Sequence, residues 1–354
     1  MKKFLFFWLL GATLFLSLPV VAQDELTDLI NQGVDLNDAG KYPEALKKYE
    51  QALLIDKKSS RAYYEIGYTY QAMKQYDNAI KAYDKVIKMG EKDETLLLTY
   101  MNKASILDDA GKPKEAVKLY KKGIEIYPDH YLLHFNLGIT YTRLQEYDLA
   151  ETALGNAILL NTAHASSHRL LGYLQTGKGN RVQGLLALYF FLLIEPKTER
   201  GIEVYNEVME QLQKGATIDK KPDGSVTINI NPAYSESSDT TFGNTEMVLS
   251  MSVLAWETIN TNEQIAKLKG TTDEQFFVDV TNTFFGNLME LQAKSPKQGI
   301  YWDLYVTFFA KLQKAGHTEA FCYHISQSKG AVVDKWMKEN GEKIDAFYTW
   351  LQSQ

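Results

Sequence analysis

The sequence predicts an all-α protein in which helical hairpins stack into a solenoid and a smaller helical domain follows. Two columns of small residues support this prediction, because they advance along the chain together in steps of 34, 37, 34 and 34 residues. The first column consists of Gly33, Gly67, Ala104, Gly138 and Gly172. The second consists of Ala45, Ala79, Ala116, Ala150 and Gly184. A period of this length indicates a repeat protein, here with five units.

Large residues follow the same period and indicate how each unit is built. Their column consists of Tyr49, Tyr83, Tyr120, Leu154 and Leu188. Turn-like strings at 39–42 and 110–113 separate the two small columns, so each unit is expected to be two helices joined by a tight turn. A single hairpin cannot bury its own apolar face, and stacking of neighbours provides the common core.

This pattern resembles the tetratricopeptide repeat (TPR) family over residues 26–198. The most specific string lies in the second unit and consists of Tyr63, Gly67, Tyr70, Tyr76, Ala79 and Tyr83. On this resemblance the array covers residues 23–215, with repeats at 26–59, 60–93, 97–130, 131–164 and 165–198. An amphipathic helix over residues 199–214 is expected to cap it. The resemblance implies a right-handed superhelix whose first helices line a concave groove.

The resemblance also implies which side chains face that groove. They are Arg61, Tyr64, Tyr68, Gln71, Met101, Asp108, Phe135, Arg143, Arg169 and Tyr173. Exposed aromatic and arginine side chains often anchor protein interfaces, although some of these residues are alternatively expected to pack between repeats. One TPR subfamily grips a C-terminal carboxylate with Lys and Asn, and here Ile30 and Val34 stand at the matching positions. The groove is therefore expected to bind an extended or helical polypeptide segment instead.

The N-terminus has the layout of a secretory signal peptide over residues 1–22. Lys2 and Lys3 precede an apolar run over residues 4–18, and small residues end at Ala22. Cleavage after Ala22 is expected, which predicts export to the periplasm or beyond the cell. The alternative is an uncleaved anchor, but the run is shorter than the ~20 residues that a spanning helix needs.

The charge of the chain argues against a nucleic-acid partner, and its cysteine content rules out an internal disulfide. Of the 38 basic residues, Lys2 and Lys3 lie in the signal, which leaves 36 against 44 acidic residues. We expect no nucleic-acid partner, because phosphate contacts need clustered basic side chains. Cys322 is the single cysteine, so it cannot form an internal disulfide, and it is expected to be a buried apolar residue.

The remainder of the chain shows no 34-residue period, and we identify no family for it. Residues 216–243 are expected to form a polar linker. Within it, polar and apolar residues alternate over 225–230, which favours a short strand or hairpin. Residues 244–354 are expected to form a helical domain of five or six helices, with Thr272 capping one of them. A binding cleft lined by Trp302 and Trp336 is an alternative to plain core packing.

Few residue patterns suggest chemistry. His130 and His134, like His164 and His168 one repeat later, have the spacing of metal ligands on a helix. However, His134 and His168 occupy a packing column of the repeat, and we expect neither a metal nor another cofactor. A Cys322–histidine pair is not expected either, because Cys322 and His324 point to different helix faces.

The sequence therefore favours a non-catalytic, exported scaffold that binds a partner polypeptide. A rival hypothesis makes the C-terminal domain an enzyme or ligand-binding module that the repeats position. That hypothesis expects charged groups to converge there, with Asp303, Glu319 and His324 as the candidates.

Overall fold

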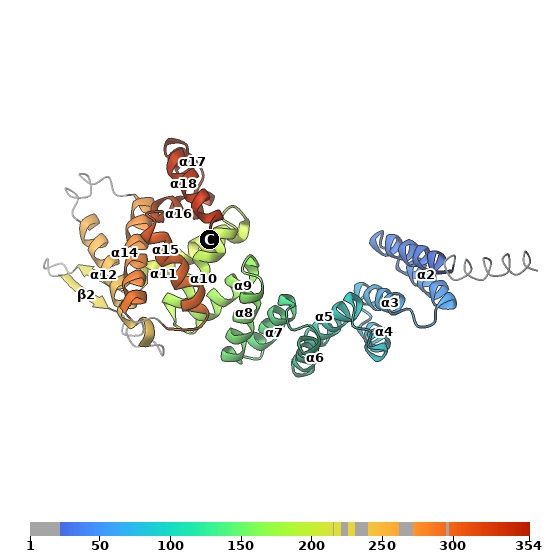
Figure 1. The fold of residues 1–354 in the computed structure, drawn as a ribbon. Coiled ribbons are helices and arrows are strands. Elements are labelled where there is room, and N and C mark those ends of the chain that lie inside the picture. The colour runs from blue at the N-terminus through green and yellow to red at the C-terminus, as the bar shows by residue number, and fades with distance from the viewer. Residues whose placement is uncertain (1–21, 215, 221–225, 231–239, 262–271, 295–296) are drawn as a thin grey trace, which may run out of the picture. The chain divides into compact units, whose positions relative to one another are not determined.

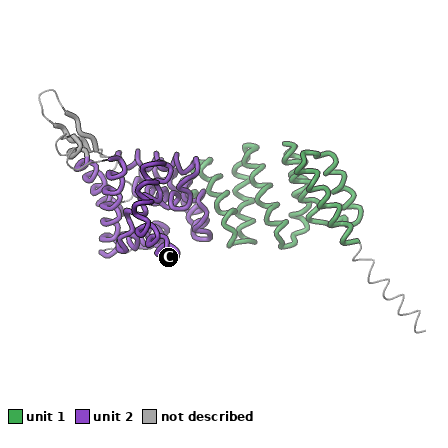
Figure 2. Tube along the Cα trace, turned by 90° about the horizontal axis from the view of Figure 1, so that it is seen from above, with its two compact units in different colours: residues 1–150 green, residues 151–354 purple. Residues whose placement is uncertain are grey.

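A computed structural model of the chain describes residues 22–214, 216–220, 226–230, 240–261, 272–294 and 297–354. It confirms the predicted helical class. The chain forms two compact units, residues 1–150 and residues 151–354 (Figure 2). Apart from Ala22, the predicted signal peptide lies outside the described residues.

Unit 1 is a series of helices joined by short turns (Figure 1). A helix over residues 22–38 is followed by α2 (Tyr42–Ile55), α3 (Ser60–Ala72), α4 (Tyr76–Met89), α5 (Glu94–Asp109), α6 (Pro113–Ile126) and α7 (Tyr131–Arg143). Gly40 and Gly111 hold the left-handed conformation (φ 72° and 75°) at turns that the sequence predicted. The hydroxyl of Ser59 caps α3 by accepting the Ala62 amide at 3.2 Å.

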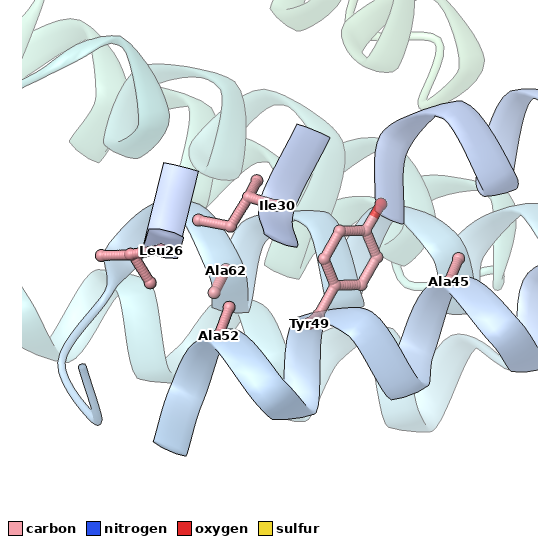
Figure 3. Close-up of a cluster of buried hydrophobic side chains, with 6 residues drawn as sticks. All are labelled: Leu26, Ile30, Ala45, Tyr49, Ala52 and Ala62. Atoms are coloured by element: carbon pink, nitrogen blue, oxygen red, sulfur yellow. The ribbon is translucent and has the colours of Figure 1, made fainter. Parts of the chain in front are cut away.

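The small-residue column makes room for the large-residue column of the same hairpin. An added Cβ at Gly33 would lie 2.3 Å from the ring of Tyr49, and one at Gly67 would lie 2.5 Å from the ring of Tyr83. Figure 3 shows Tyr49 rising from α2, with Ala45 and Ala52 one turn away on either side. The column that begins with Gly33 and the column of large residues that begins with Tyr49 therefore share one period, because in these hairpins the small residue leaves room for the large side chain.

Replacing Gly67 by valine is expected to destabilise unit 1 by about 3 kcal/mol, because the branched side chain collides with the buried Tyr83 ring. Gly67→Ala is the graded comparison. Its single methyl group also meets the Tyr83 ring, so it should cost stability, but less than the branched valine does. Urea denaturation measures both changes. Equal stability of the valine and alanine variants would contradict this packing.

The first helices of the hairpins form a continuous layer in unit 1. Helix α3 packs on α5 and α5 packs on α7, in addition to the contacts that each makes with α4 or α6. We call the exposed surface of the helix over residues 22–38, α3, α5 and α7 the inner face.

Unit 2 contains the last repeat helices and the C-terminal helices. After α8 (Tyr147–Leu160), which begins at the end of unit 1, come α9 (Ala165–Gly177), α10 (Arg181–Ile194) and α11 (Glu199–Gln213). Strands β1 (Ala216–Lys220) and β2 (Val226–Ile230) pair antiparallel, with Ala216 opposite Ile230. The later helices are α12 (Gly243–Thr261), α14 (Asp273–Lys294), a π-helical segment (Tyr301–Val306), α15 (Thr307–Lys314), α16 (Thr318–Ile325), α17 (Ala331–Glu339) and α18 (Gly341–Gln352), with 3-10 turns at Thr240–Phe242 and Gln327–Lys329.

Helix α10 is the centre of unit 2. Every side chain from Arg181 to Leu192 is buried, whereas a helix at the edge of an array would keep one face in solvent. It packs on α9 and α11 and also on α12, α16 and the π-helical segment (Figure 1). The ring of Tyr189 contacts five phenylalanine rings, those of Phe277, Phe284, Phe285, Phe309 and Phe321. The fifth hairpin and the C-terminal helices thus share one core.

Candidate functional site

The inner face of unit 1 carries four of the predicted groove residues on α3 alone. Arg61 is exposed, Tyr64 and Gln71 are half-buried, and Tyr68 is 44% exposed. The rings of Tyr64 and Tyr68 stack with centroids 6.2 Å apart and an angle of 17° between their planes. An accessible aromatic ring on a packed neighbour is the kind of group that anchors interfaces.

Hydrogen bonds between neighbouring hairpins hold these side chains in place. Arg61 donates to Asn31 Oδ1 at 2.9 Å, which links α3 to the helix over residues 22–38. Asn102 of α5 donates to the Tyr64 hydroxyl at 3.1 Å. Burial raises the pKa of Tyr64 to about 12, so this phenol is neutral at physiological pH. Neither Asn31 nor Asn102 could be selected from the sequence, because a hydrogen bond between repeats leaves no periodic signal.

Asp108 and Arg143 meet at the junction of α5 and α7. The Asp108 carboxylate is buried, accepts the Thr140 hydroxyl at 2.9 Å and lies 2.8 Å from the Arg143 guanidinium. Arg143 itself is about half exposed and also approaches Asp109 at 3.7 Å. A bridge of this kind fixes the two helices relative to each other and leaves part of the guanidinium accessible.

The remaining predicted groove residues belong to α5, α7 and α9. Met101 and Phe135 are half-buried on α5 and α7. Arg169 and Tyr173 lie on α9 in unit 2, where Arg169 approaches Glu203 of α11 at 3.9 Å. Burial raises the pKa of the half-buried Tyr173 phenol. That all ten residues line one groove stays a prediction.

The histidines have individual structural roles. His168 is buried, with Nδ1 2.8 Å from the Tyr305 hydroxyl and Nε2 2.9 Å from the Thr162 carbonyl oxygen. Both nitrogens of this ring are therefore engaged. His164 pairs with Ser167 at 2.8 Å, and His134 Nε2 lies 3.0 Å from the Pro128 carbonyl. No group of three or more potential metal ligands gathers among the described residues.

His168 makes unit 2 sensitive to acid. Burial lowers its pKa to about 4, whereas an unfolded histidine titrates near 6.5. Between these values the unfolded chain binds the proton more tightly, so stability is full above pH 6.5 and falls as the pH drops. The expected loss is about 2 kcal/mol at pH 5 and about 3 kcal/mol below pH 4.

Urea denaturation of unit 2 at pH 7.5 and pH 5 measures this loss. His168→Gln should remove most of the pH dependence. His317→Gln is the control, since His317 is less buried and its pKa is lowered less. An unchanged pH dependence in His168→Gln would refute the assignment.

Each C-terminal residue that the rival hypothesis named has a structural partner of its own. Asp303 accepts the Gly299 amide at 2.9 Å, Glu319 pairs with Lys343 at 2.7 Å, and His324 lies 3.1 Å from both the Tyr348 hydroxyl and the Leu193 carbonyl. Cys322 is buried, and burial raises its pKa, which keeps the thiol protonated.

The two tryptophans proposed to line a cleft each pack on a different ring. Trp302 is buried against Phe242, and Trp336 stacks on Tyr323 with centroids 3.8 Å apart. In the part of the chain that the structure describes, no helix is long and apolar enough to cross a membrane.

A buried ion pair in unit 2 was not predicted. Arg181 at the start of α10 has no exposed surface, and its Nε lies 2.8 Å from Glu246 Oε2 on α12. The guanidinium also donates to Ser250 Oγ at 3.0 Å and to the Lys214 carbonyl, while Glu246 accepts the Val182 amide at 3.0 Å. The two residues are far apart in sequence, so no local pattern reveals their contact.

Comparison with known proteins identifies the repeats. Family models described as "Tetratricopeptide repeat" match residues 58–129 and 109–172, and one described as "TPR repeat" matches residues 33–74. The BBSome complex member BBS4 of Bos taurus is 29% identical over 119 residues, which are 34% of this chain and 22% of that protein. The TPR repeat-containing protein MJ1428 of Methanocaldococcus jannaschii is 27% identical over 135 residues, 36% of this chain and 23% of that protein.

Among solved structures, the TPR protein YrrB is 21% identical, with a TM-score of 0.41. The match covers 50% of this chain and 90% of that one. The chain spans about a quarter or less of the length of the two curated relatives it matches, so the likeness concerns the repeats. The periodic columns, the small-on-large packing within hairpins and the family matches agree: residues 33–172 of this chain are a tetratricopeptide-repeat segment.

Proposed function

We propose that the inner face of unit 1 binds an extended or helical segment of a partner polypeptide, and that the protein is a non-catalytic, exported scaffold. One observation carries this proposal: Tyr68 is an accessible aromatic ring stacked on a neighbour that is itself hydrogen-bonded to the next hairpin. A ring held in this way loses little conformational entropy when a partner covers it.

The chemistry of the inner face favours a polypeptide. Bonds that link successive hairpins, such as Arg61 to Asn31 and Arg143 to Asp108, lie at intervals along several helices. A long face on which such fixed side chains recur at intervals suits a polypeptide segment that presents its own side chains at regular spacing. The formal net charge of −6 disfavours a nucleic-acid partner.

The proposals of export and of a non-catalytic role have their own support. Export rests on the signal-peptide layout of residues 1–22. Mass spectrometry of the native protein should show Gln23 as the first residue, and a mature chain that keeps Met1 would contradict export by cleavage. The non-catalytic role is supported by the separate structural partners of Asp303, Glu319 and His324.

Truncating the anchor side chains tests the proposed binding. Tyr68→Ala and Phe135→Ala together should lower the recovery of partners crosslinked in intact cells at least tenfold, as interface anchors commonly contribute 1–2 kcal/mol each or more. Tyr76→Ala is the control, because Tyr76 is similarly exposed but begins the second helix α4. Equal recovery with the double variant and the control would refute binding at the inner face.

A further inference from the structure

One carboxylate on the inner face lacks a counter-ion within the described residues. Glu65 of α3 is half-buried and makes no hydrogen bond or ion pair there. Arg61, one turn earlier, donates to Asn31 instead. Burial raises the pKa of the Glu65 carboxyl, Arg61 acts in the opposite direction, and the nearby Asp38 raises it further. An anion placed in this way gains free energy from any cation that reaches it.

Two buried polar groups in the first hairpin also lack partners in the described structure. In the second hairpin the Tyr83 hydroxyl donates to Gln71 Oε1 at 3.0 Å. The equivalent pair one repeat earlier is Tyr49 and Asn37, whose shorter side chain leaves both the hydroxyl and Asn37 Oδ1 without a hydrogen bond. Asn37 is more than nine-tenths buried. The uncompensated partial negative charge of this buried oxygen acts through space on a nearby cation, although the atom itself is closed to solvent.

Glu65 is near enough to the first hairpin to act electrostatically on one of these groups. The charges of both Glu65 and Asp38 act on the Tyr49 phenol, whose pKa burial raises. Tyr68 lies three residues after Glu65 on the same helical face, and its ring is accessible. A carboxylate beside an accessible aromatic face is a favourable environment for a cation.

The neighbouring helix strengthens the negative field. The helix over residues 22–38 carries five carboxylates and no basic side chain, namely Asp24, Glu25, Asp28, Asp35 and Asp38. Arg61 is the one basic residue of α3. A cluster of one sign attracts ligands of the opposite sign.

We propose that this end of the inner face, formed by Asn37, Glu65 and Tyr68, is a subsite for a basic side chain of the bound segment. This inference rests on the proposed function and adds to it that the bound segment carries a positively charged side chain. Arginine fits better than lysine, because its planar fork of donors matches the two oxygens of the Glu65 carboxylate, and the same plane can stack on the accessible ring of Tyr68.

Synthetic peptides of about a dozen residues test the subsite on the full-length mature protein. Three peptides share apolar positions and differ at one central residue, which is arginine, citrulline or glutamate. Citrulline keeps the shape of arginine but has no charge. Fluorescence anisotropy should show the arginine peptide binding about tenfold more tightly than the citrulline peptide, and the glutamate peptide binding most weakly, since one charge-assisted contact commonly changes affinity by that factor.

Conservative variants assign the preference to Glu65. Glu65→Gln should bring the arginine and citrulline peptides to equal affinity, whereas Glu115→Gln, an exposed carboxylate on α6, should leave the tenfold preference intact.

The outcomes separate this inference from the proposed function. If all three peptides bind equally and Tyr68→Ala weakens them equally, the inner face binds peptides but has no basic subsite. A tenfold preference that survives Glu65→Gln also overturns the subsite. If none of the peptides binds at up to millimolar concentration, both proposals fail.

Discussion

A chain that ends at Lys214 is expected to lose the fold of α9–α11 and to aggregate. Such a chain keeps the predicted repeat array but removes the side chains that cover α10. Tyr189 and Phe190 then become exposed to water, because their ring contacts come largely from α14, α15, α16 and the π-helical segment. Exposing a large apolar side chain costs on the order of 2–3 kcal/mol, and domains are stable by only about 5–15 kcal/mol.

Size-exclusion chromatography and hydrogen exchange of the truncated chain measure this effect. The substitution Tyr189→Lys is made in the full-length chain and in the truncated chain, and its effects in the two are compared. In the full-length chain the substitution should unfold unit 2, because it places a charge in an apolar core. In the truncated chain the same substitution should improve solubility, because Tyr189 is exposed there. A monomeric truncated chain with protected α10 amides would show that the array is independent of the C-terminal helices.

Replacing Arg181 by methionine is expected to destabilise unit 2 by about 3–5 kcal/mol. The substitution leaves the Glu246 carboxylate buried without its cation, and it removes the donor that satisfies the Lys214 carbonyl at the end of α11. Burial already raises the pKa of Glu246, which Arg181 opposes. Thermal denaturation monitored by circular dichroism at pH 7 measures the loss.

The double variant Arg181→Met with Glu246→Met separates charge from packing. Replacing both members of a buried ion pair by apolar side chains is often nearly neutral, so the double variant should recover most of the stability that the single variant loses. If the double variant is as unstable as Arg181→Met alone, the hydrogen bonds to backbone carbonyls and not the ion pair hold α10 and α12 together.

The repeats were predictable because their physics is local and periodic. The small columns follow from the room that Gly33 and Gly67 leave for Tyr49 and Tyr83, and this contact lies within one hairpin. The turns follow from left-handed positions such as Gly40 and Gly111. The predicted cap of α14 is also local, with the Thr272 hydroxyl accepting the Gln275 amide at 3.2 Å.

The arrangement of unit 2 was not predictable in this way. The sequence of α10 is apolar on every side, which indicates burial all round but not which helices provide it. The contact of Arg181 with Glu246 joins residues 65 positions apart. Composition predicts a linker and a separate domain after residue 215, whereas helices from both sides of that point pack together in unit 2.

The candidate site was predicted in part. The family pattern selected Arg61, Tyr64, Tyr68 and Gln71 as one helix face, and their positions follow from helical spacing. It did not select Glu65, whose significance depends on Arg61 bonding to Asn31 and on Asn37 being shorter than Gln71. Such differences between repeats are absent from the average pattern of a family.

Site-specific photo-crosslinking in intact cells tests the central claim most directly. A photoreactive amino acid replaces Tyr68 on the inner face in one strain and Leu54, a highly exposed residue of the second helix α2, in another. Our account predicts a discrete crosslinked polypeptide from position 68 that is absent or much weaker from position 54. Equal crosslinking from both positions, or a discrete product from position 54 alone, would contradict binding at the inner face.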